Sequence, residues 1–218
     1  MILEPEFILF DLDNTLYPRD CGLFDHVDHL INRYLEEVVK IPLAEVDHRR
    51  RAYWQAHGTT LNGLMVHHDV DPHHYLDFVH DVSLADYLEP DEKLVAMIAE
   101  LPGEKYIFSN ASNEHCQKVL DYLGLDEIFA AVYDINYFNF RPKPELVIYQ
   151  ELLDDINGTA ENGIMIDDMA VNLEPAASLG MATILYGPSS SIISPQSLPP
   201  KGQSLTSLHE LPQLINKL

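Results

Sequence analysis

Five short runs of apolar residues recur along the chain, and segments with helical character separate them. The runs are rich in β-branched and aromatic residues, which favour strands. Strands that alternate with helices are typical of a parallel sheet with helices on its faces. We therefore predict an α/β protein with a Rossmann-like, doubly wound parallel sheet. Its strands are expected at residues 6–10, 105–109, 130–134, 163–167 and 182–186.

Polar residues close or directly follow four of these runs: Asp11, Ser109, Asp134 and Asp167. In a doubly wound sheet, ligand-binding groups gather at the carboxyl ends of the strands. The sequence therefore predicts a functional site at this edge of the sheet. That site must contain cations, because several carboxylates converge on it.

The connection between the first and second runs is unusually long. Residues 11–104 lie between them, whereas a crossover in a parallel sheet needs only a few tens of residues. Residues 22–88 have helical character and little strand character. We predict that residues 17–88 form an inserted helical cap, while residues 1–16 and 89–218 form the α/β core.

Four core helices are expected, and Gly or Pro marks an end of three of them. Gly124 is a favourable C-cap, and Pro144 is a favourable first helical residue. The Ser- and Pro-rich stretch 187–204 is predicted to be an extended loop, and a short helix is expected from Ser207. The four core helices are predicted at residues 91–101, 113–123, 144–155 and 171–179, the last ending before Gly180.

The chain is strongly acidic, with a formal net charge of -22 over 218 residues. A nucleic-acid polymer or an anionic membrane binds basic surfaces, so we expect neither as a partner. The N-terminus lacks the pattern of a secretory signal, and no apolar run is long enough to span a bilayer. Two isolated cysteines, Cys21 and Cys116, fit a reducing compartment. We predict a cytoplasmic protein, and the sequence does not indicate its oligomeric state.

Four separated features fall at one site if the sheet forms as predicted. Taken singly, each has an ordinary explanation, such as a turn, a helix cap or a solvated lysine. Their combined order along the chain favours a shared site. The features are Asp11-Leu12-Asp13-Asn14-Thr15, Ser109-Asn110, Lys143 within RPKPE, and Asp167-Asp168.

In that order, the four features resemble the four motifs of the haloacid dehalogenase-like hydrolases. The resemblance covers the whole predicted core, and the long insertion is similar to that family's C1 cap. A narrower likeness to the pyrimidine 5′-nucleotidase branch rests on four stretches of the sequence. They are DNTLYP at 13–18, HGTTLNGL at 57–64, VHDV at 79–82 and YIFSNAS at 106–112.

Charge balance predicts a Mg²⁺ ion at this site. Two like unit charges about 4 Å apart repel by roughly 4 kcal/mol at an effective dielectric constant near 20. Several carboxylates would therefore not face a phosphate dianion unless Mg²⁺ and Lys143 supplied positive charge. The predicted metal ligands are Asp11, the main-chain carbonyl of Asp13, Asp168, and Asp167 directly or through water, with Asn172 orienting the acidic pair.

The remaining roles follow from phosphoryl transfer through an aspartyl-phosphate. Asp11 is the predicted nucleophile. Asp13 is predicted to protonate the leaving oxygen and then to activate the attacking water. Ser109 Oγ and the Asn110 backbone N–H are predicted to hold the phosphoryl oxygens together with Lys143.

Asp13 also discriminates between two reactions. Members that resemble the dehalogenases lack an acid at this position, because a halide leaves without a proton and an alkoxide needs one. We therefore predict hydrolysis of a small phosphate monoester, such as a pyrimidine nucleoside 5′-monophosphate. A phosphotransferase or sugar-phosphate mutase, a phosphate-binding module without turnover, and a cap that serves mainly as a dimer surface remain alternatives.

The cap contains further candidates. His57 and Thr60 are predicted substrate contacts because they fall in an expected loop. The stretch HHDVDPHH at 67–74 offers a zinc ligand set of His67, Asp71 and His74. We favour a different role for Asp71, as the N-cap of a helix whose first residue is a proline.

Overall fold

The computed structural model describes residues 4–187 and 202–217. The chain forms two compact units. The core unit consists of Met1–Asp20 and Glu89–Leu218, and the cap unit consists of Cys21–Leu88. The first break therefore falls after Asp20, four residues later than the sequence predicts, and the second falls at the predicted position.

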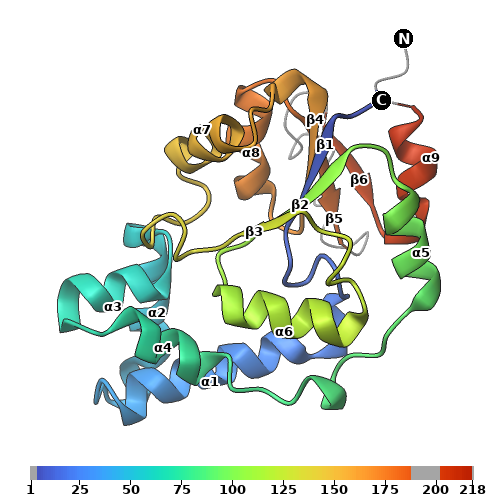
Figure 1. Cartoon of the computed structure of the whole chain (residues 1–218). Helices are drawn as coiled ribbons and strands as arrows, with labels where there is room; N and C mark the ends of the chain where they lie inside the picture. Colours follow the sequence, from blue (N-terminus) through green and yellow to red (C-terminus); the bar gives the residue numbers. More distant parts are fainter. Residues whose placement is uncertain (1–3, 188–201, 218) are drawn as a thin grey trace. The chain divides into compact units, whose positions relative to one another are not determined.

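A parallel sheet forms the centre of the core, with the strand order β3-β2-β1-β4-β5-β6 (Figure 1). The five predicted strands are present to within one residue at each end, which confirms the doubly wound α/β fold. The strands are β1 (Phe7–Phe10), β2 (Glu104–Phe108), β3 (Ala131–Tyr133), β4 (Gly163–Asp167), β5 (Ala182–Tyr186) and β6 (Gly202–Leu205).

Strand β1 lies in the middle of the sheet. Because helices cover both faces of the sheet, the side chains of β1 are apolar without alternation. All four of its residues are buried, and Leu9 pairs with Tyr106 of β2 on one side and with Met165 of β4 on the other. Phe7 and Leu9 pack into one hydrophobic cluster with Phe108 and residues of the helices that follow β3 and β4. This packing fixes the position at which β1 ends and delivers Asp11 to the edge of the sheet.

Figure 1 shows helices on both sides of the sheet, with α7 and α8 on one side and α5 and α9 on the other. Helix α6 matches its prediction at both ends, and Gly124 ends it in the left-handed conformation with φ 72°. The core helices are α5 (Glu92–Glu100), α6 (Asn113–Leu123), α7 (Leu146–Asp155), α8 (Ala170–Ser178) and α9 (Leu211–Ile215), with short 3-10 turns at Arg19–Cys21, Ala160–Asn162 and Leu208–Glu210.

The prediction that Pro144 opens a helix is wrong. Helix α7 begins at Leu146, and Glu145 is its N-cap. The Lys143 N–H donates to Asn110 Oδ1 at 2.8 Å, and the Glu145 N–H donates to the Pro142 carbonyl at 3.0 Å. These bonds hold residues 142–145 in a turn that places Lys143, so the helix starts two residues later than its sequence signal indicates.

The prediction of an extended loop over residues 187–204 is wrong for its last part. Gly202–Leu205 forms β6, which pairs in parallel with β5 at the edge of the sheet. Gly, Gln and Ser have low strand propensity, so the segment carries no strand signal of its own, and its backbone pairing with β5 decides its conformation. Residues 188–201 of the predicted loop lie outside the described residues.

The cap is helical, as predicted, and its helices have clear sequence causes. In α1, Leu23, Val27, Leu30 and Tyr34 recur on one face and are buried. A Cβ at Gly63 would lie 2.3 Å from Tyr53 Cβ, so this glycine allows α3 to approach α2 closely. The cap helices are α1 (Leu23–Glu37), α2 (Leu43–His57), α3 (Thr60–His68) and α4 (Pro72–Val79), followed by a 3-10 turn at Leu84–Asp86.

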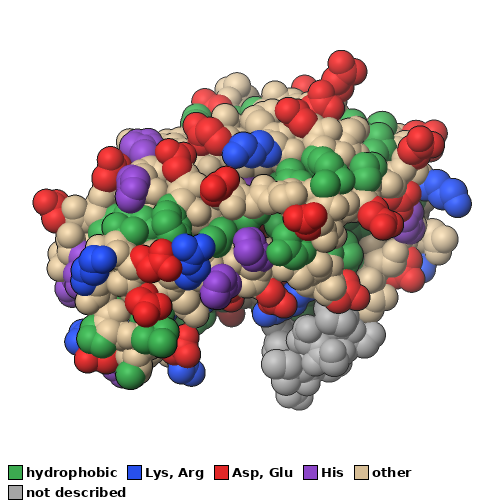
Figure 2. Space-filling model, turned by 90° about the horizontal axis from the view of Figure 1, so that it is seen from below, with side chains coloured by type: hydrophobic (Ala, Val, Ile, Leu, Met, Phe, Trp, Pro, Cys, Tyr) green, Lys and Arg blue, Asp and Glu red, His purple; other side chains and the backbone are tan. Residues whose placement is uncertain are grey.

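Within residues 4–187 and 202–217, none of the helices combines the length and the apolar character that a membrane span requires. Figure 2 shows acidic side chains spread over one face of the molecule, with Lys and Arg dispersed among them. In such a surface, local cations rather than overall charge must attract an anionic ligand.

Candidate active site

Asp11 follows β1 directly and is buried at 7% exposure. Its backbone N–H donates to the Ile166 carbonyl at 2.9 Å, which extends the pairing of β1 with β4 by one residue. The Thr15 hydroxyl donates to Asp11 Oδ2 at 3.0 Å. One oxygen of the predicted nucleophile is thus fixed from within its own motif.

Lys143 supplies the positive charge at this edge of the sheet. Its Nζ lies 2.7 Å from each of three acceptors: Asp11 Oδ1, Asp167 Oδ2 and the Phe108 carbonyl. Burial lowers the pKa of Lys143, but the charges of Asp11 and Asp167 outweigh this effect and raise the pKa above its ordinary value. The ammonium therefore stays charged and joins the ends of β1, β2 and β4.

The Asn110 side chain positions Lys143. Its Nδ2 donates to the Lys143 carbonyl at 3.2 Å, while its Oδ1 accepts from the Lys143 N–H at 2.8 Å. This paired bond connects the end of β2 to the turn before α7 across 33 residues of sequence. The sequence predicts a role only for the backbone N–H of Asn110, so the role of its side chain is an addition.

Asp167 is fully buried and accepts hydrogen bonds on both oxygens. Lys143 Nζ and Asn172 Nδ2 contact Oδ2, and the Met169 N–H and Asn172 Nδ2 contact Oδ1. Asn172 thus orients Asp167 through both of its oxygens. Asp167 in turn shares the Lys143 ammonium with Asp11.

Asp11, Asp167 and Asp168 each place a carboxylate oxygen within 4.8 Å of the others, an arrangement that could hold a metal ion. Three carboxylates face one ammonium, which leaves two negative charges in excess. Burial and the charge of Asp167 raise the pKa of Asp168 to about 7, and burial also raises the pKa of Asp11. An all-oxygen donor set with this excess charge fits a hard divalent cation such as Mg²⁺.

Asp13 lies near the same edge but has different partners. The Tyr17 hydroxyl donates to Asp13 Oδ1, and His115 Nε2 lies 3.0 Å from the same oxygen. The Asp13 side chain is 15% exposed, and His115 is 1% exposed. The Asp13 side chain is thus more exposed than those of Asp11 and Asp167, which are 9% and 0% exposed.

The two other polar strand ends stabilise the loops beside the site. Ser109 is buried, and its Oγ accepts from the Ala111 N–H at 3.0 Å. Asp134 accepts from the Asn113 N–H at 2.9 Å and from the Tyr137 N–H at 2.9 Å. Asp134 therefore ties the first turn of α6 to the end of β3 and organises the loop after β3.

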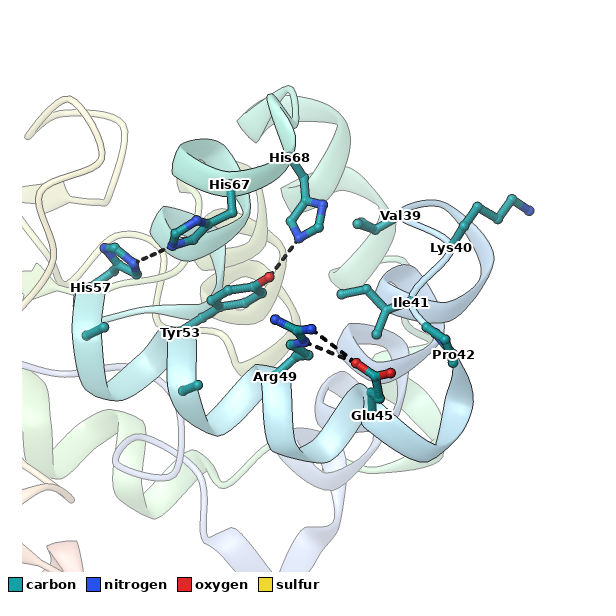
Figure 3. Close-up of a pocket in the computed structure, with 12 residues that line it drawn as sticks. Val39, Lys40, Ile41, Pro42, Glu45, Arg49, Tyr53, His57, His67 and His68 are labelled. Carbon is teal, nitrogen blue, oxygen red and sulfur yellow. Dashed lines mark hydrogen bonds and ion pairs between the residues drawn. The ribbon is translucent and has the colours of Figure 1, made fainter.

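His57 and Thr60, the candidates from the cap, do not share one environment. His57 lines a cavity of about 510 Å³ inside the cap unit, between α2, α3 and residues 39–42. Figure 3 shows His57 and His67 pointing toward each other at one end of this cavity, and their Nε2 atoms are 3.0 Å apart. Thr60 is buried at the first position of α3 and is not among the residues that line the cavity.

The conceivable zinc set of His67, Asp71 and His74 is not gathered in the described part of the chain. His67 contacts His57, and Asp71 is the N-cap of α4, where its Oδ1 accepts from the His73 N–H at 3.0 Å. The Tyr34 hydroxyl and His74 Nδ1 are 2.9 Å apart. The favoured interpretation of Asp71 as a helix cap is confirmed.

Three residues of this site carried no role in the sequence prediction: Thr15, Tyr17 and His115. Thr15 and Tyr17 stand four residues after Asp11 and Asp13, a spacing that a single turn of chain brings together. That spacing was a usable signal. His115 is 102 positions from Asp13, and no local pattern links the two.

A model of the family described as haloacid dehalogenase-like hydrolase matches residues 6–180. Phosphate metabolism protein 8 of Saccharomyces cerevisiae is 27% identical over 193 residues, which are 81% of this chain and 60% of that protein. The chain thus spans less than two thirds of the length of this relative.

Two solved structures share the fold. YfnB from Bacillus subtilis, solved bound to magnesium, superposes with a TM-score of 0.65 at 20% identity, covering 98% of this chain and 99% of that one. A 2-haloacid dehalogenase from Pseudomonas syringae pv. Tomato DC3000 superposes with a TM-score of 0.63 at 16% identity, covering 98% and 99% of the two chains.

Proposed function

The chain belongs to the haloacid dehalogenase-like hydrolases, and on that premise we propose that it is a Mg²⁺-dependent phosphomonoester hydrolase. The fold alone does not choose between haloacids and phosphate esters, since a dehalogenase superposes on the chain as well as other hydrolases do. Asp13 is the observation that carries the choice. It places an acid two residues beyond the nucleophile, with access to solvent, and only an alkoxide leaving group needs such a proton donor.

The carboxylates support a role for Mg²⁺. Asp11, Asp168 and the main-chain carbonyl of Asp13 would hold the ion. Asp167 would act through water, because both of its oxygens already accept hydrogen bonds from Lys143, Asn172 and Met169. When bound, Mg²⁺ supplies positive charge that offsets the carboxylates and the phosphoryl oxygens.

In the first half-reaction, a carboxylate oxygen of Asp11 forms a bond to phosphorus, and the bond from phosphorus to the ester oxygen breaks. Asp13 gives its proton to the leaving oxygen, which departs as an alcohol. Lys143 lies 2.7 Å from Asp11 Oδ1, so its charge is in place to stabilise the transferring phosphoryl group. The product is an aspartyl-phosphate at Asp11.

In the second half-reaction, Asp13 takes a proton from water, and the water oxygen attacks phosphorus. The bond between phosphorus and Asp11 breaks, inorganic phosphate leaves, and both aspartates return to their starting states. Ser109 Oγ and the Asn110 N–H, at the end of β2, are proposed to hold phosphoryl oxygens in both steps.

The proposed substrates are small phosphorylated metabolites, and a pyrimidine nucleoside 5′-monophosphate is the first candidate. The sequence likeness of residues 13–18, 57–64, 79–82 and 106–112 to the nucleotidase branch supports this choice. We further propose that the enzyme works in the cytoplasm without a nucleic-acid or membrane partner, as its two cysteines and acidic composition suggest.

A panel of phosphate monoesters, including pyrimidine and purine nucleoside monophosphates, tests the proposal. We expect phosphate release with Mg²⁺, loss of release with a chelator, and no phosphoenzyme in Asp11→Asn. Turnover that a chelator leaves unchanged would contradict the mechanism. Absence of turnover on every ester, with phosphate still bound, would instead support a binding module, and transfer to an added alcohol in preference to water would support a phosphotransferase.

A further inference from the structure

Two donors meet one oxygen of Asp13. The Tyr17 hydroxyl and His115 Nε2 both contact Oδ1. The two donor residues are 2% and 1% exposed, whereas the Asp13 side chain is 15% exposed. Buried donors around a partly exposed carboxyl group are a costly arrangement unless they satisfy a specific acceptor.

The sequence holds each donor in place from a different element. Tyr17 follows a turn after β1, in which the Thr15 and Leu16 N–H groups donate to the Leu12 carbonyl at 3.2 and 2.9 Å. His115 stands at the third position of α6, and its N–H donates to the Ser112 Oγ at 3.3 Å. Both donors therefore meet Asp13 from rigidly anchored backbone.

Helix α6 is itself fixed at the edge of the sheet. Besides the Ser112 cap, Asp134 accepts from the Asn113 N–H at 2.9 Å, which ties the first turn of α6 to the end of β3. Cys116 and Val119, on the inner face of α6, are fully buried. The imidazole of His115 thus has a defined position relative to the end of β1.

We propose that Tyr17 and His115 are positioning residues that hold the Asp13 carboxyl group through Oδ1 for proton transfer to the leaving group. A carboxyl group held on one oxygen keeps a fixed orientation, and the Tyr17 hydroxyl that donates to Oδ1 stabilises the negative charge left after transfer.

This inference rests on the proposed function and names its substrate class. A precisely held acid matters only when the leaving group is a poor one. The preferred substrates are therefore phosphate monoesters of alkyl alcohols, as in nucleoside or sugar phosphates, and not aryl or acyl phosphates.

The test compares two substrates in single-turnover experiments with saturating Mg²⁺: a nucleoside 5′-monophosphate and 2,4-dinitrophenyl phosphate. Release of the leaving group reports the first half-reaction alone. For Tyr17→Phe and His115→Leu, we expect release from the alkyl ester to slow by roughly 10- to 100-fold and release from the activated ester to slow by less than about threefold. His115→Gln, which restores an N–H donor, should recover most of the lost rate.

Val119→Ala provides a matched control, because Val119 is buried on α6 and its side chain has no polar atom. Damage to the helix should change both rates together in this variant, and thermal melts check the folding of all variants. Equal slowing of both substrates in Tyr17→Phe and His115→Leu, or an unchanged alkyl rate in both, overturns the inference and leaves the hydrolase proposal standing. A wild-type protein that cleaves neither ester overturns both.

Discussion

The acidic edge of the core and the histidine-rich part of the cap both gather ionisable side chains, but they hold them differently. At the core edge, Lys143 Nζ is buried and lies 2.7 Å from two carboxylates that are themselves buried. In the cap, His67 and His68 are exposed. Tyr53 stacks on His67 with ring centroids 5.3 Å apart, and its hydroxyl is 2.7 Å from His68 Nε2.

This difference in burial predicts how strongly the side chains of each region depend on their partners. A buried charge has no water to replace a lost partner, so each member of the core cluster depends on the rest. An exposed histidine exchanges a protein contact for water at little cost. Loss of one group should therefore disturb the whole core cluster and should stay local in the cap.

Lys143→Met should produce the largest effect. It removes the ammonium and leaves Asp11 and Asp167 without their shared cation. We expect turnover of phosphate esters to fall by at least about 1000-fold. Without Mg²⁺, the free energy of unfolding should fall by about 3 kcal/mol, the cost of breaking a buried ion pair. Steady-state kinetics and urea unfolding in the presence of a chelator measure the two quantities.

Lys118→Met is the control, because Lys118 is exposed on α6. It should leave turnover unchanged and alter the free energy of unfolding by less than about 0.5 kcal/mol. Similar losses in the two lysine variants would remove the contrast between buried and exposed charges.

Mg²⁺ binding should depend on pH through Asp168, whose pKa burial and the charge of Asp167 raise to about 7. Below that pH, Mg²⁺ must displace a proton, so its affinity should fall by about tenfold per pH unit. In the Mg²⁺-free protein, the raised pKa of Asp168 also contributes to the free energy of unfolding. This contribution is complete below pH 3.8 and is lost as the pH rises through about 7. Calorimetric Mg²⁺ titrations at pH 6, 7 and 8 measure the affinity.

Asp168→Asn provides the comparison for this titration, because it removes the ionisable group. The variant should bind Mg²⁺ weakly, with a shallower pH dependence. An affinity that stays constant between pH 6 and 7 in the wild-type protein would show that Asp168 is already ionised there.

Asn110→Ala separates two roles at the end of β2. The variant keeps the backbone N–H predicted to bind phosphate and removes the side chain that pairs with the Lys143 backbone. We expect the free energy of unfolding to fall by about 1–2 kcal/mol and kcat to fall by about tenfold, because Lys143 loses its fixed position. If kcat is unchanged, the backbone N–H is the sole contribution of Asn110.

The sequence predicted the site best at residues that stand at the end of a strand. Asp11, Ser109 and Asp167 stand at the ends of apolar runs, so a parallel sheet brings them together whatever the loops do. The turn that carries Lys143 has no such pattern, and only the order of the four motifs indicated its position. The same turn displaced the start of α7 from Pro144.

Contacts between distant segments account for what the sequence could not predict. His115 reaches Asp13 across 102 residues, and its spacing on α6 is that of an ordinary core residue. Strand β6 depends on pairing with β5 and has no apolar run. In the cap, the sequence favoured Asp71 as a helix cap over a zinc ligand, and Asp71 does cap α4, but no local pattern indicated that His74 contacts Tyr34.

His57→Ala should produce the smallest effect and tests the cap side of the comparison. Loss of the contact with His67 should change the free energy of unfolding by less than about 1 kcal/mol, since both groups have access to water. If His57 also contacts substrate, KM for a nucleoside 5′-monophosphate should rise several-fold while kcat stays constant, as expected when an interaction is made equally in the ground and transition states. His67→Ala is the matched control, because it breaks the same contact and keeps the His57 side chain. Equal KM values in both variants and the wild-type protein would limit the role of this histidine pair to the cap itself.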